Sequence, residues 1–332
     1  MKTLVNVLNR IPDVSLILCG VLAWEASGDI YGADISITWQ KHQLDQLFYS
    51  EGASFGDING DGTNDIISGP WVYFGPEFSA DKRVAIYDPK PFNKAGYSDN
   101  FFSFTRDFNG DGTLDVLVLG FPGKDASWFE NPGKEALGKG FWKRNLVLEP
   151  VDNESPMFAD LTGDGKPEII CSQNGIFGFA EPNPSDPAKP WTFRKITPEQ
   201  STGAKFTHGL GMGDVNGDGR MDLLEKNAWW EQPASLEGDP AWTRHLFAFA
   251  GAGGADMFAY DFDGDGDNDI LTSLAAHGYG LVWYEQFEEN GKKAFRPHKI
   301  VGQTPQENPY GVAFSQMHAI ALADVDGDGV KD

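Results

Sequence analysis

Six short loops rich in acidic residues carry the clearest chemistry in this sequence. Each has nine residues, with Asp first, Asn, Thr or Asp third, Asp fifth, Gly sixth and an acid ninth, and they begin at Asp57, Asp107, Asp160, Asp214, Asp261 and Asp324. Side-chain oxygens at positions 1, 3, 5 and 9, with a main-chain carbonyl at position 7, suit a hard cation such as Ca²⁺. Mg²⁺ suits the loop less well, because it holds to a strict octahedron and keeps its waters. We therefore expect one Ca²⁺ in each loop.

The predicted calcium ligands are the residues at positions 1, 3, 5, 7 and 9 of the six loops. In chain order they are Asp57, Asn59, Asp61, Thr63, Asp65, Asp107, Asn109, Asp111, Thr113, Asp115, Asp160, Thr162, Asp164, Lys166, Glu168, Asp214, Asn216, Asp218, Arg220, Asp222, Asp261, Asp263, Asp265, Asp267, Asp269, Asp324, Asp326, Asp328, Val330 and Asp332.

A second group of side chains departs from the repeat. Glu154, His208 and His318 each stand six residues before a loop, and His277 stands eight residues after one. If each loop joins the first two strands of a repeat, these offsets return all four residues to one rim of the fold, roughly 20 Å from the ions at about 3.3 Å per residue. We expect them at the mouth of a central channel, with Asp256 close by. Such a set could bind a further divalent metal or perform acid–base catalysis, and it could equally hydrogen-bond neighbouring loops in place.

The other three histidines follow the repeat. His42, His245 and His298 each end a Trp/Phe-x-x-His segment, in which the aromatic residue stands three positions earlier. A residue that recurs in phase with the repeat is expected to serve the fold, so we predict a structural role for these three.

The elements that must position these residues repeat in step with the loops. The loop starts lie 47 to 63 residues apart, a period typical of propellers and solenoids. An apolar run follows each of the first five loops, then an aromatic segment that ends in an acid and often an amide, then a fourth segment such as Trp242 to His245. With the stretch before each loop, this makes four strands per repeat. The pattern predicts an all-β propeller of four-stranded blades, with six blades visible.

The two ends of the chain carry separate predictions. Residues 1–35 contain Lys2 and Arg10, an apolar stretch and small residues in the order of a secretory leader, so the propeller is expected over residues 36–332. An ordinary buried N-terminus is the alternative. Trp39 to His42 is a fourth-strand element that should complete the last blade. Because the sequence stops at the last ligand of loop six, we expect the sixth blade to be truncated. A longer chain would contain the rest of this blade and could contain a seventh.

Composition narrows the partners and the compartment. The formal net charge is −23, much of it in the loops, and no basic patch is present to replace the counterions of a nucleic acid. We expect no stable membrane insertion once the leader is removed. Loops of this kind often bind at the millimolar calcium found outside cells, which favours a secreted, periplasmic or cell-surface location. Without the leader Cys171 is the only cysteine, so no internal disulfide can form.

At this point the sequence resembles a known family. The loops, set between an apolar strand and an Ile/Leu/Val strand, resemble the FG-GAP or VCBS repeats of integrin-α-type propellers over residues 36 to 332. Five segments further resemble secreted bacterial VCBS proteins related to the propeller of aldos-2-ulose dehydratase, a metal-dependent enzyme family that removes water from oxidised sugars. They are Ser50–Gly52, Gly120–Lys124, His208–Asp214, Ala276–Gly278 and Ser315–Ala319.

Two functions of different classes follow from these observations. The first is an extracytoplasmic calcium-binding propeller that binds carbohydrate or a cell-surface protein. The alternative is a metal-dependent carbohydrate lyase whose catalytic residues are His208, His277, His318 and Glu154. Aromatic residues that could be exposed and stack on sugar rings are Trp71, Tyr73, Tyr97, Phe121 and Tyr279.

Overall fold

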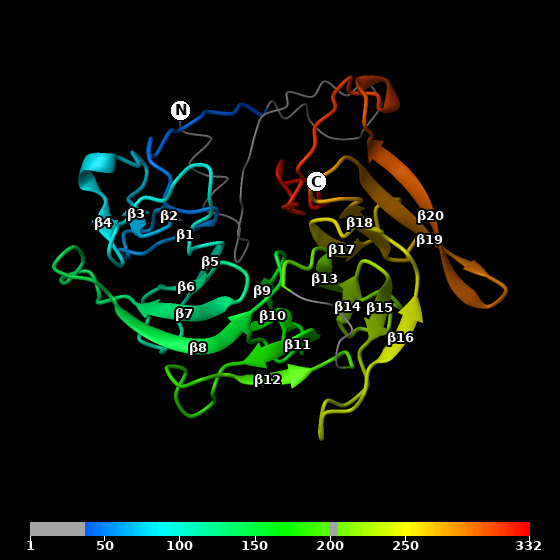
Figure 1. Ribbon diagram of the computed structural model, residues 1–332, viewed down its shortest axis with the longest axis horizontal. Helices are drawn as coiled ribbons and strands as arrows, with labels where there is room; N and C mark the ends of the chain where they lie inside the picture. Colours follow the sequence, from blue (N-terminus) through cyan, green and yellow to red (C-terminus); the bar gives the residue numbers. More distant parts are fainter. Residues whose placement is uncertain (1–36, 199–204) are drawn as a thin grey trace. The chain divides into compact units, whose positions relative to one another are not determined.

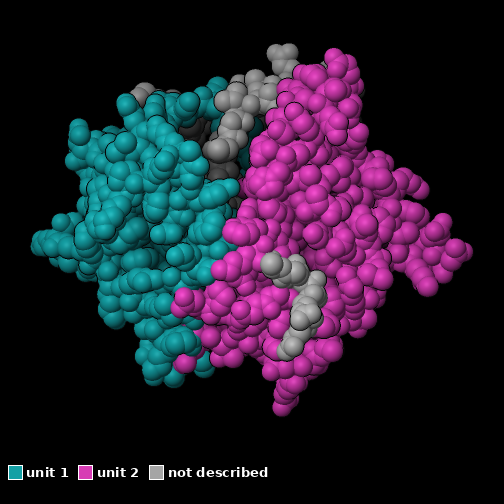
Figure 2. Space-filling view, in the orientation of Figure 1, with its two compact units in different colours: residues 1–147, 184–190, 321–332 teal, residues 148–183, 191–320 magenta. Residues whose placement is uncertain are grey.

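The protein is built almost entirely of β-strands. The computed structural model describes residues 37–198 and 205–332, so the predicted leader lies outside the described residues. Two short 3₁₀ turns, η1 (Ala80–Lys82) and η2 (Pro305–Glu307), accompany the strands. Among the residues described, no helix has the length and apolar character needed to cross a bilayer. The chain divides into two compact units (Figure 2): unit 1 comprises residues 37–147, 184–190 and 321–332, and unit 2 comprises 148–183 and 191–320.

Two four-stranded sheets begin in unit 1, and each follows the order of the chain (Figure 1). The division between the units falls within the last strand of the second sheet. The first sheet contains β1 (Ala53–Gly56), β2 (Asp65–Ser68), β3 (Trp71–Tyr73) and β4 (Val84–Ala85), and the second contains β5 (Phe102–Arg106), β6 (Asp115–Leu119), β7 (Lys124–Glu130) and β8 (Lys143–Val151).

Unit 2 repeats the same sheet three times. The last two repeats join through a parallel pairing of β13 with β17, in which Leu210 lies opposite Asp256. The three sheets contain β9 (Met157–Ala159), β10 (Glu168–Gln173), β11 (Ile176–Glu181) and β12 (Thr192–Lys195); β13 (Leu210–Gly213), β14 (Asp222–Glu225), β15 (Ala228–Glu231) and β16 (Thr243–Leu246); and β17 (Asp256–Tyr260), β18 (Asp269–Ser273), β19 (Leu281–Glu289) and β20 (Lys292–Val301).

The strand pattern confirms four antiparallel strands per repeat for the first five repeats. In each of them the acidic loop joins the first and second strands, as predicted. The number of blades and their closure into a ring stay predictions.

The prediction of a strand at Trp39–His42 is wrong. Residues 39–42 form no strand, because a strand needs a hydrogen-bonded neighbour and no described backbone group pairs with them. His42 therefore differs from the other two in-phase histidines: its ring packs edge-on against Phe78, with 5.6 Å between centroids. The stretch before loop six likewise forms no extended strand.

The acid at position 9 of each loop is a hydrogen-bond acceptor, and it is buried in the first five loops. Asp222 is typical: one carboxylate oxygen accepts the main-chain N–H of Val215 at position 2 (3.0 Å), and the other accepts the N–H of Gln232 (2.9 Å). Because Gln232 follows the third strand, the acid ties the loop to the outer half of its own sheet. Corresponding bonds to the position 2 N–H are made by Asp65, Asp115, Glu168, Asp269 and Asp332.

The amide that directly follows the acid of the aromatic segment ties one repeat to an earlier one. The side-chain nitrogen of Asn131 donates to the carbonyl of Ile58 in loop one (2.9 Å), and that of Gln232 donates to the carbonyl of Leu161 in loop three (2.8 Å). Gln286, in the amide orientation that satisfies both its neighbours, reaches the carbonyl of Val215 (3.0 Å). The recurring amide in the sequence is therefore a buried bond between successive repeats.

Apolar side chains fill the space between successive sheets of each unit. Within unit 1, Ile67 and Val72 of the first sheet belong to one core cluster with Val116 and Phe129 of the second. Two further clusters in unit 2 pack β9–β12 against β13–β16 and β13–β16 against β17–β20. Each repeat therefore buries its apolar faces only by stacking on its neighbours, as expected of a repeat protein.

Candidate functional site

Four of the side chains that break the repeat meet in unit 2. Glu154, His208, His277 and His318 each offer one ligand atom, and these four atoms all lie within 4.8 Å of one another. They come from four separate segments of the chain. The predicted juxtaposition is therefore present, and what the four residues do stays a prediction.

The segments that carry Glu154 and His208 are tied together by main-chain bonds. The N–H of Glu154 donates to the carbonyl of Thr207 (2.9 Å), and the N–H of Phe206 donates to the carbonyl of Asp152 (2.9 Å). Gly253 then packs against His208, since a Cβ at residue 253 would lie 2.6 Å from the His208 carbonyl oxygen and the φ of +87° favours glycine. A larger residue there would displace His208.

The segments that carry His277 and His318 are tied together by Gln316. Its side-chain nitrogen donates to the carbonyl of His277 (2.9 Å), and its own N–H donates to the carbonyl of Gly278 (3.1 Å). Its carbonyl lies 3.1 Å from Nδ1 of His318. A proton on Nδ1 would donate to this carbonyl and leave Nε2 of His318 with a free lone pair.

The four side chains differ in exposure and charge. The side chains of His208 and Glu154 are sheltered, at 12% and 16% exposure, whereas His277 is exposed. Burial by itself would raise the pKa of Glu154, but His208 at 2.8 Å and the positive charges that His318 and His277 can carry outweigh it and hold this pKa below its usual range. Glu154 is therefore a carboxylate at neutral pH, ready to act as a ligand or a base.

The cluster fits a divalent transition metal. Nε2 of His208 is buried and forms no hydrogen bond of normal geometry, although Glu154 lies 2.8 Å away. Three imidazoles and a carboxylate are the donors that Zn²⁺ and similar ions take, at about 2.0–2.2 Å, which separates tetrahedral ligands by about 3.4 Å. The observed spacing thus requires a contraction on the order of 1 Å, which rotamer changes can supply.

Two other acids bear on the prediction of this cluster. Asp256 begins β17, and its carboxylate accepts the N–H of Ile320 (3.2 Å); burial raises its pKa to about 7. Glu51, which has the same offset in the first repeat, lies in unit 1 and accepts bonds from the N–H and hydroxyl of Ser98. At the same offset, the Glu51 carboxylate is therefore bound within its own unit.

Two of the in-phase histidines have the contacts of structural residues. The His245 ring stacks on Trp229 at 3.9 Å between centroids and contacts the Glu231 carboxylate at 2.8 Å. His298 repeats this arrangement with Trp283, at 4.4 Å, and Glu285. In both repeats an acid of the third strand therefore partners the histidine of the fourth strand.

The six predicted calcium-binding loops share one geometry. Asp57 accepts the N–H groups of Asp61 (3.0 Å) and Gly62 (2.8 Å) within its own loop, and the first acid of each other loop makes equivalent bonds. Gly62 takes a φ of +85° at the sharp turn, which favours glycine.

Several observations fit a cation in these loops. Oδ1 of Asn59, a predicted ligand, is buried without a hydrogen-bond partner. Loops three, five and six each bring three carboxylates within 4.8 Å of one another. In loop four Arg220 pairs with Asp218, and in loop three Lys166 lies 4.0 Å from Asp164, so these two loops carry a cation of their own.

Other residues were missed or misjudged from the sequence. Gln316 was not singled out, and its role depends on a φ of +65° that composition does not reveal. Tyr73 was expected to be exposed, but it is 1% exposed because β3 buries it, and the guanidinium of Arg83 covers Trp71 at 4.0 Å. Tyr97 and Tyr279 are exposed as expected.

Part of the chain is similar to a known repeat family. The profile of the FG-GAP-like repeat matches residues 107–171. A search of curated proteins found no match. Among solved structures, a lectin of Agrocybe aegerita that recognises terminal N-acetylglucosamine is 20% identical, with a TM-score of 0.43, over 75% of this chain and 65% of the lectin.

Two further solved structures, both of larger proteins, are similar to this chain over part of their length. The V. cholerae biofilm matrix protein Bap1 is 17% identical, with a TM-score of 0.34, over 69% of this chain and 33% of Bap1. The Bacillus licheniformis rhamnogalacturonan lyase PL11 is 14% identical, with a TM-score of 0.32, over 83% of this chain and 38% of the lyase. This chain thus spans less than two thirds of each of these proteins. With TM-scores below 0.5, none of them assigns a function to it.

Proposed function

We propose that Glu154, His208, His277 and His318 bind one divalent transition metal, and that the protein is an extracytoplasmic, calcium-binding β-repeat module that binds carbohydrate through this metal. The meeting of three imidazoles and a carboxylate in one place carries the proposal. The Thr207 carbonyl accepts the N–H of Glu154, and Gln316 donates to the His277 carbonyl, so fixed bonds hold the ligand-bearing segments as outer-shell contacts do in metal sites.

The carbohydrate part of the proposal follows from the shape of the cluster. The exposed edge at His277 leaves access for a ligand, while Glu154 and His208 are sheltered on the other side. A six-coordinate ion such as Mn²⁺, held by these four protein groups, would keep two positions for further oxygen ligands, and vicinal hydroxyls of a sugar provide two. The alternative ligand of the metal is a carboxylate presented by a cell-surface protein.

The calcium loops serve the stability of the module in this proposal. Each of the first five joins two strands of a sheet, so an ion there would hold the sheet's first hairpin and relieve repulsion among its carboxylates. A requirement for millimolar calcium would accord with a location outside the cytoplasm.

A metal-dependent carbohydrate lyase is the second candidate, and the exposure of His277 favours it. In this version Glu154, His208 and His318 hold the metal, which when bound would polarise the carbonyl of a keto sugar. His277 takes the proton α to the carbonyl, the hydroxyl on the β carbon leaves as water, and a conjugated enone remains.

Metal analysis of matched variants tests the site. The purified chain, stripped and then dialysed against Zn²⁺ or Mn²⁺ with excess Ca²⁺, should retain about one transition metal, and His208→Ala or His318→Ala should weaken its binding more than about 100-fold. His245→Ala and His298→Ala are the controls, because they remove histidines with structural contacts, and they should bind as the wild type does. Equal retention by all four variants would refute the site.

An ultraviolet assay separates the two functions. With 1,5-anhydrofructose as substrate, the lyase version predicts growing enone absorbance that His277→Ala abolishes. If His277→Ala retains the metal, the assignment of this residue as base in the lyase version is supported. Sugar binding without any absorbance change would refute the lyase and support the binding module.

A further inference from the structure

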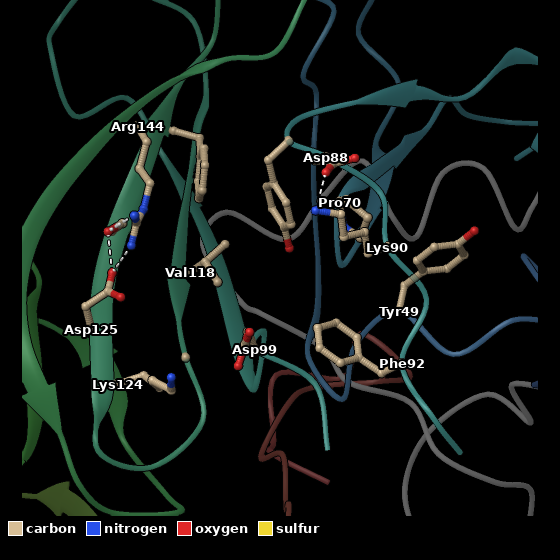
Figure 3. Close-up of a pocket in the computed structure, with 14 residues that line it drawn as sticks. Tyr49, Pro70, Asp88, Lys90, Phe92, Asp99, Val118, Lys124, Asp125 and Arg144 are labelled. Atoms are coloured by element: carbon tan, nitrogen blue, oxygen red, sulfur yellow. Dashed lines mark hydrogen bonds and ion pairs between the residues drawn. The ribbon is translucent and has the colours of Figure 1, made fainter. Parts of the chain in front are cut away.

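A pocket in unit 1 shares no residue with the histidine cluster of unit 2. It has a volume of about 410 Å³, within the range of about 300 to 1,000 Å³ typical of small-ligand sites. Figure 3 shows it between the strands that carry Val118 and Arg144 and the segments that carry Tyr49, Asp88 and Phe92. None of its lining residues belongs to a calcium loop.

Aromatic rings form much of the pocket wall. Tyr87 stacks on Phe129 with 4.9 Å between centroids and an interplanar angle of 29°, and Phe92 packs edge-on against Phe48. The Tyr87 hydroxyl accepts a bond from the Asn100 side chain (3.0 Å), and its own proton has no acceptor among the residues that the structure describes. The wall thus offers flat apolar faces together with a fixed hydroxyl donor.

The charges of the pocket divide into paired and unpaired groups. Arg144 binds Asp125 (2.6 Å), as the dashed lines in Figure 3 show, and Lys90 binds Asp88 (2.7 Å). In contrast, neither the ammonium of Lys124 nor the carboxylate of Asp99 has a side-chain partner within the described part of the chain. The pocket therefore presents one free cationic donor and one free anionic acceptor.

The free donor and the free acceptor lie on two segments that are held together. The N–H of Phe101 donates to the carbonyl of Leu119 (2.9 Å), and the N–H of Gly120 donates to the carbonyl of Asp125 (3.0 Å), which closes the turn that carries Lys124. A Cβ at Gly120 would meet Lys124 at 2.8 Å, so glycine keeps this turn close to the pocket. The position of both groups is thus built into the backbone.

An exposed aromatic patch lies on these same two segments. Tyr97, Phe101 and Phe121 form it, with ring centroids 5.3 to 5.8 Å apart, and Tyr97 is 64% exposed. Aromatic faces beside free hydrogen-bonding groups suit sugar rings, which present C–H groups on one face and hydroxyls at the edge.

We propose that this pocket binds one neutral pyranose residue of a carbohydrate without any metal, with Lys124 donating to one hydroxyl and Asp99 accepting from another. A neutral sugar fits better than an acidic one, because the one free cation is balanced by one free anion. The aromatic patch supplies the surface for the adjoining sugar. This site goes beyond the metal-dependent binding proposed for unit 2.

Saturation-transfer NMR on the full chain tests the proposal, with methyl glycosides of glucose, galactose, mannose and N-acetylglucosamine as probes and glucuronate as the acidic comparison. At least one neutral glycoside should bind, and Asp99→Asn or Lys124→Ala should weaken it about tenfold or more, the usual loss for a hydrogen bond to a charged group. Asp81→Asn and Lys139→Ala are matched controls, because both residues are exposed in unit 1 and outside the pocket, and they should change nothing.

The metal separates this proposal from the previous one. Binding in the pocket should persist after transition metals are stripped from the chain in excess Ca²⁺ and in His208→Ala, whereas binding at the histidine cluster should be lost in both. Absence of binding by every neutral probe would overturn the proposal. So would binding that only glucuronate shows, that needs the transition metal, or that Asp99→Asn and Lys124→Ala leave intact.

Discussion

Substitution of Asp222 separates the structural role of a loop acid from its ionic role. Its carboxylate is fully buried and accepts two main-chain N–H groups, from Val215 and Gln232. Asp222→Ala leaves both buried donors without an acceptor, at about 1–3 kcal/mol each, or about 2–6 kcal/mol together. Burial raises the pKa of Asp222 to about 7, so the charged carboxylate itself costs free energy above about pH 4, and the loss in the free energy of unfolding should be largest near pH 4.5 and smaller at pH 7.5. Because these bonds exist without an ion, the loss should be present in excess chelator as well as in Ca²⁺.

Asn216 in the same loop is the control. It is a predicted ligand at position 3, and its side chain bonds only to the exposed Asp218. Asn216→Ala should therefore cost less than about 0.5 kcal/mol in chelator and lower stability only when Ca²⁺ is present. Urea unfolding at pH 4.5 and 7.5, with and without Ca²⁺, measures both variants. If Asp222→Ala unfolds like the wild type in chelator at pH 4.5, the structural role of the acid is refuted.

The remaining predictions concern pH, metal affinity and the order of calcium sites. Burial raises the pKa of Asp256 in the folded protein to about 7 from 3.8, so the free energy of unfolding should fall as pH rises from about 4 through 7. Asp256→Asn keeps an acceptor for the N–H of Ile320. In this variant the unfolding midpoint should depend less on pH, and the free energy of unfolding at pH 8 should be higher than that of the wild type by up to about 4 kcal/mol. Gln316→Ala should lower transition-metal affinity about 10- to 100-fold in titration calorimetry, and a wild-type value would show that it does not position the ligands. Loop three, with Thr162 at position 3 and Glu168 at position 9, should fill last in a calcium titration, and earlier filling would contradict this order.

Periodic features of the fold were predictable from the sequence. Loops, apolar runs and aromatic segments recur at a nearly constant spacing, and such a period can be satisfied only by repeated small sheets that bury their faces on one another. The four strands of each of the first five repeats were therefore predictable. The element at Trp39–His42 shows the limit of this reasoning, because a matching pattern forms no strand without a neighbour to pair with.

The candidate site was predictable only in part. The offsets of Glu154, His208 and His318 from their loops placed them on one rim, since the rise per residue of a strand is fixed. The same offset applied to Glu51, which instead binds Ser98 in unit 1. Which residues of such a set meet depends on which repeats fold into one unit, and the offset does not contain this information.

What the sequence determined by itself is the type of each local element: the acidic loops, the strands on either side and the ligand atoms they carry. These follow from short-range geometry and from periodicity. The tertiary structure decided which elements share a site, because side chains distant in the sequence meet through backbone bonds such as those of Gln316 to His277 and Gly278. The pocket around Lys124 and Asp99 likewise emerges only when segments separated along the chain pack together, since no local pattern records their distance.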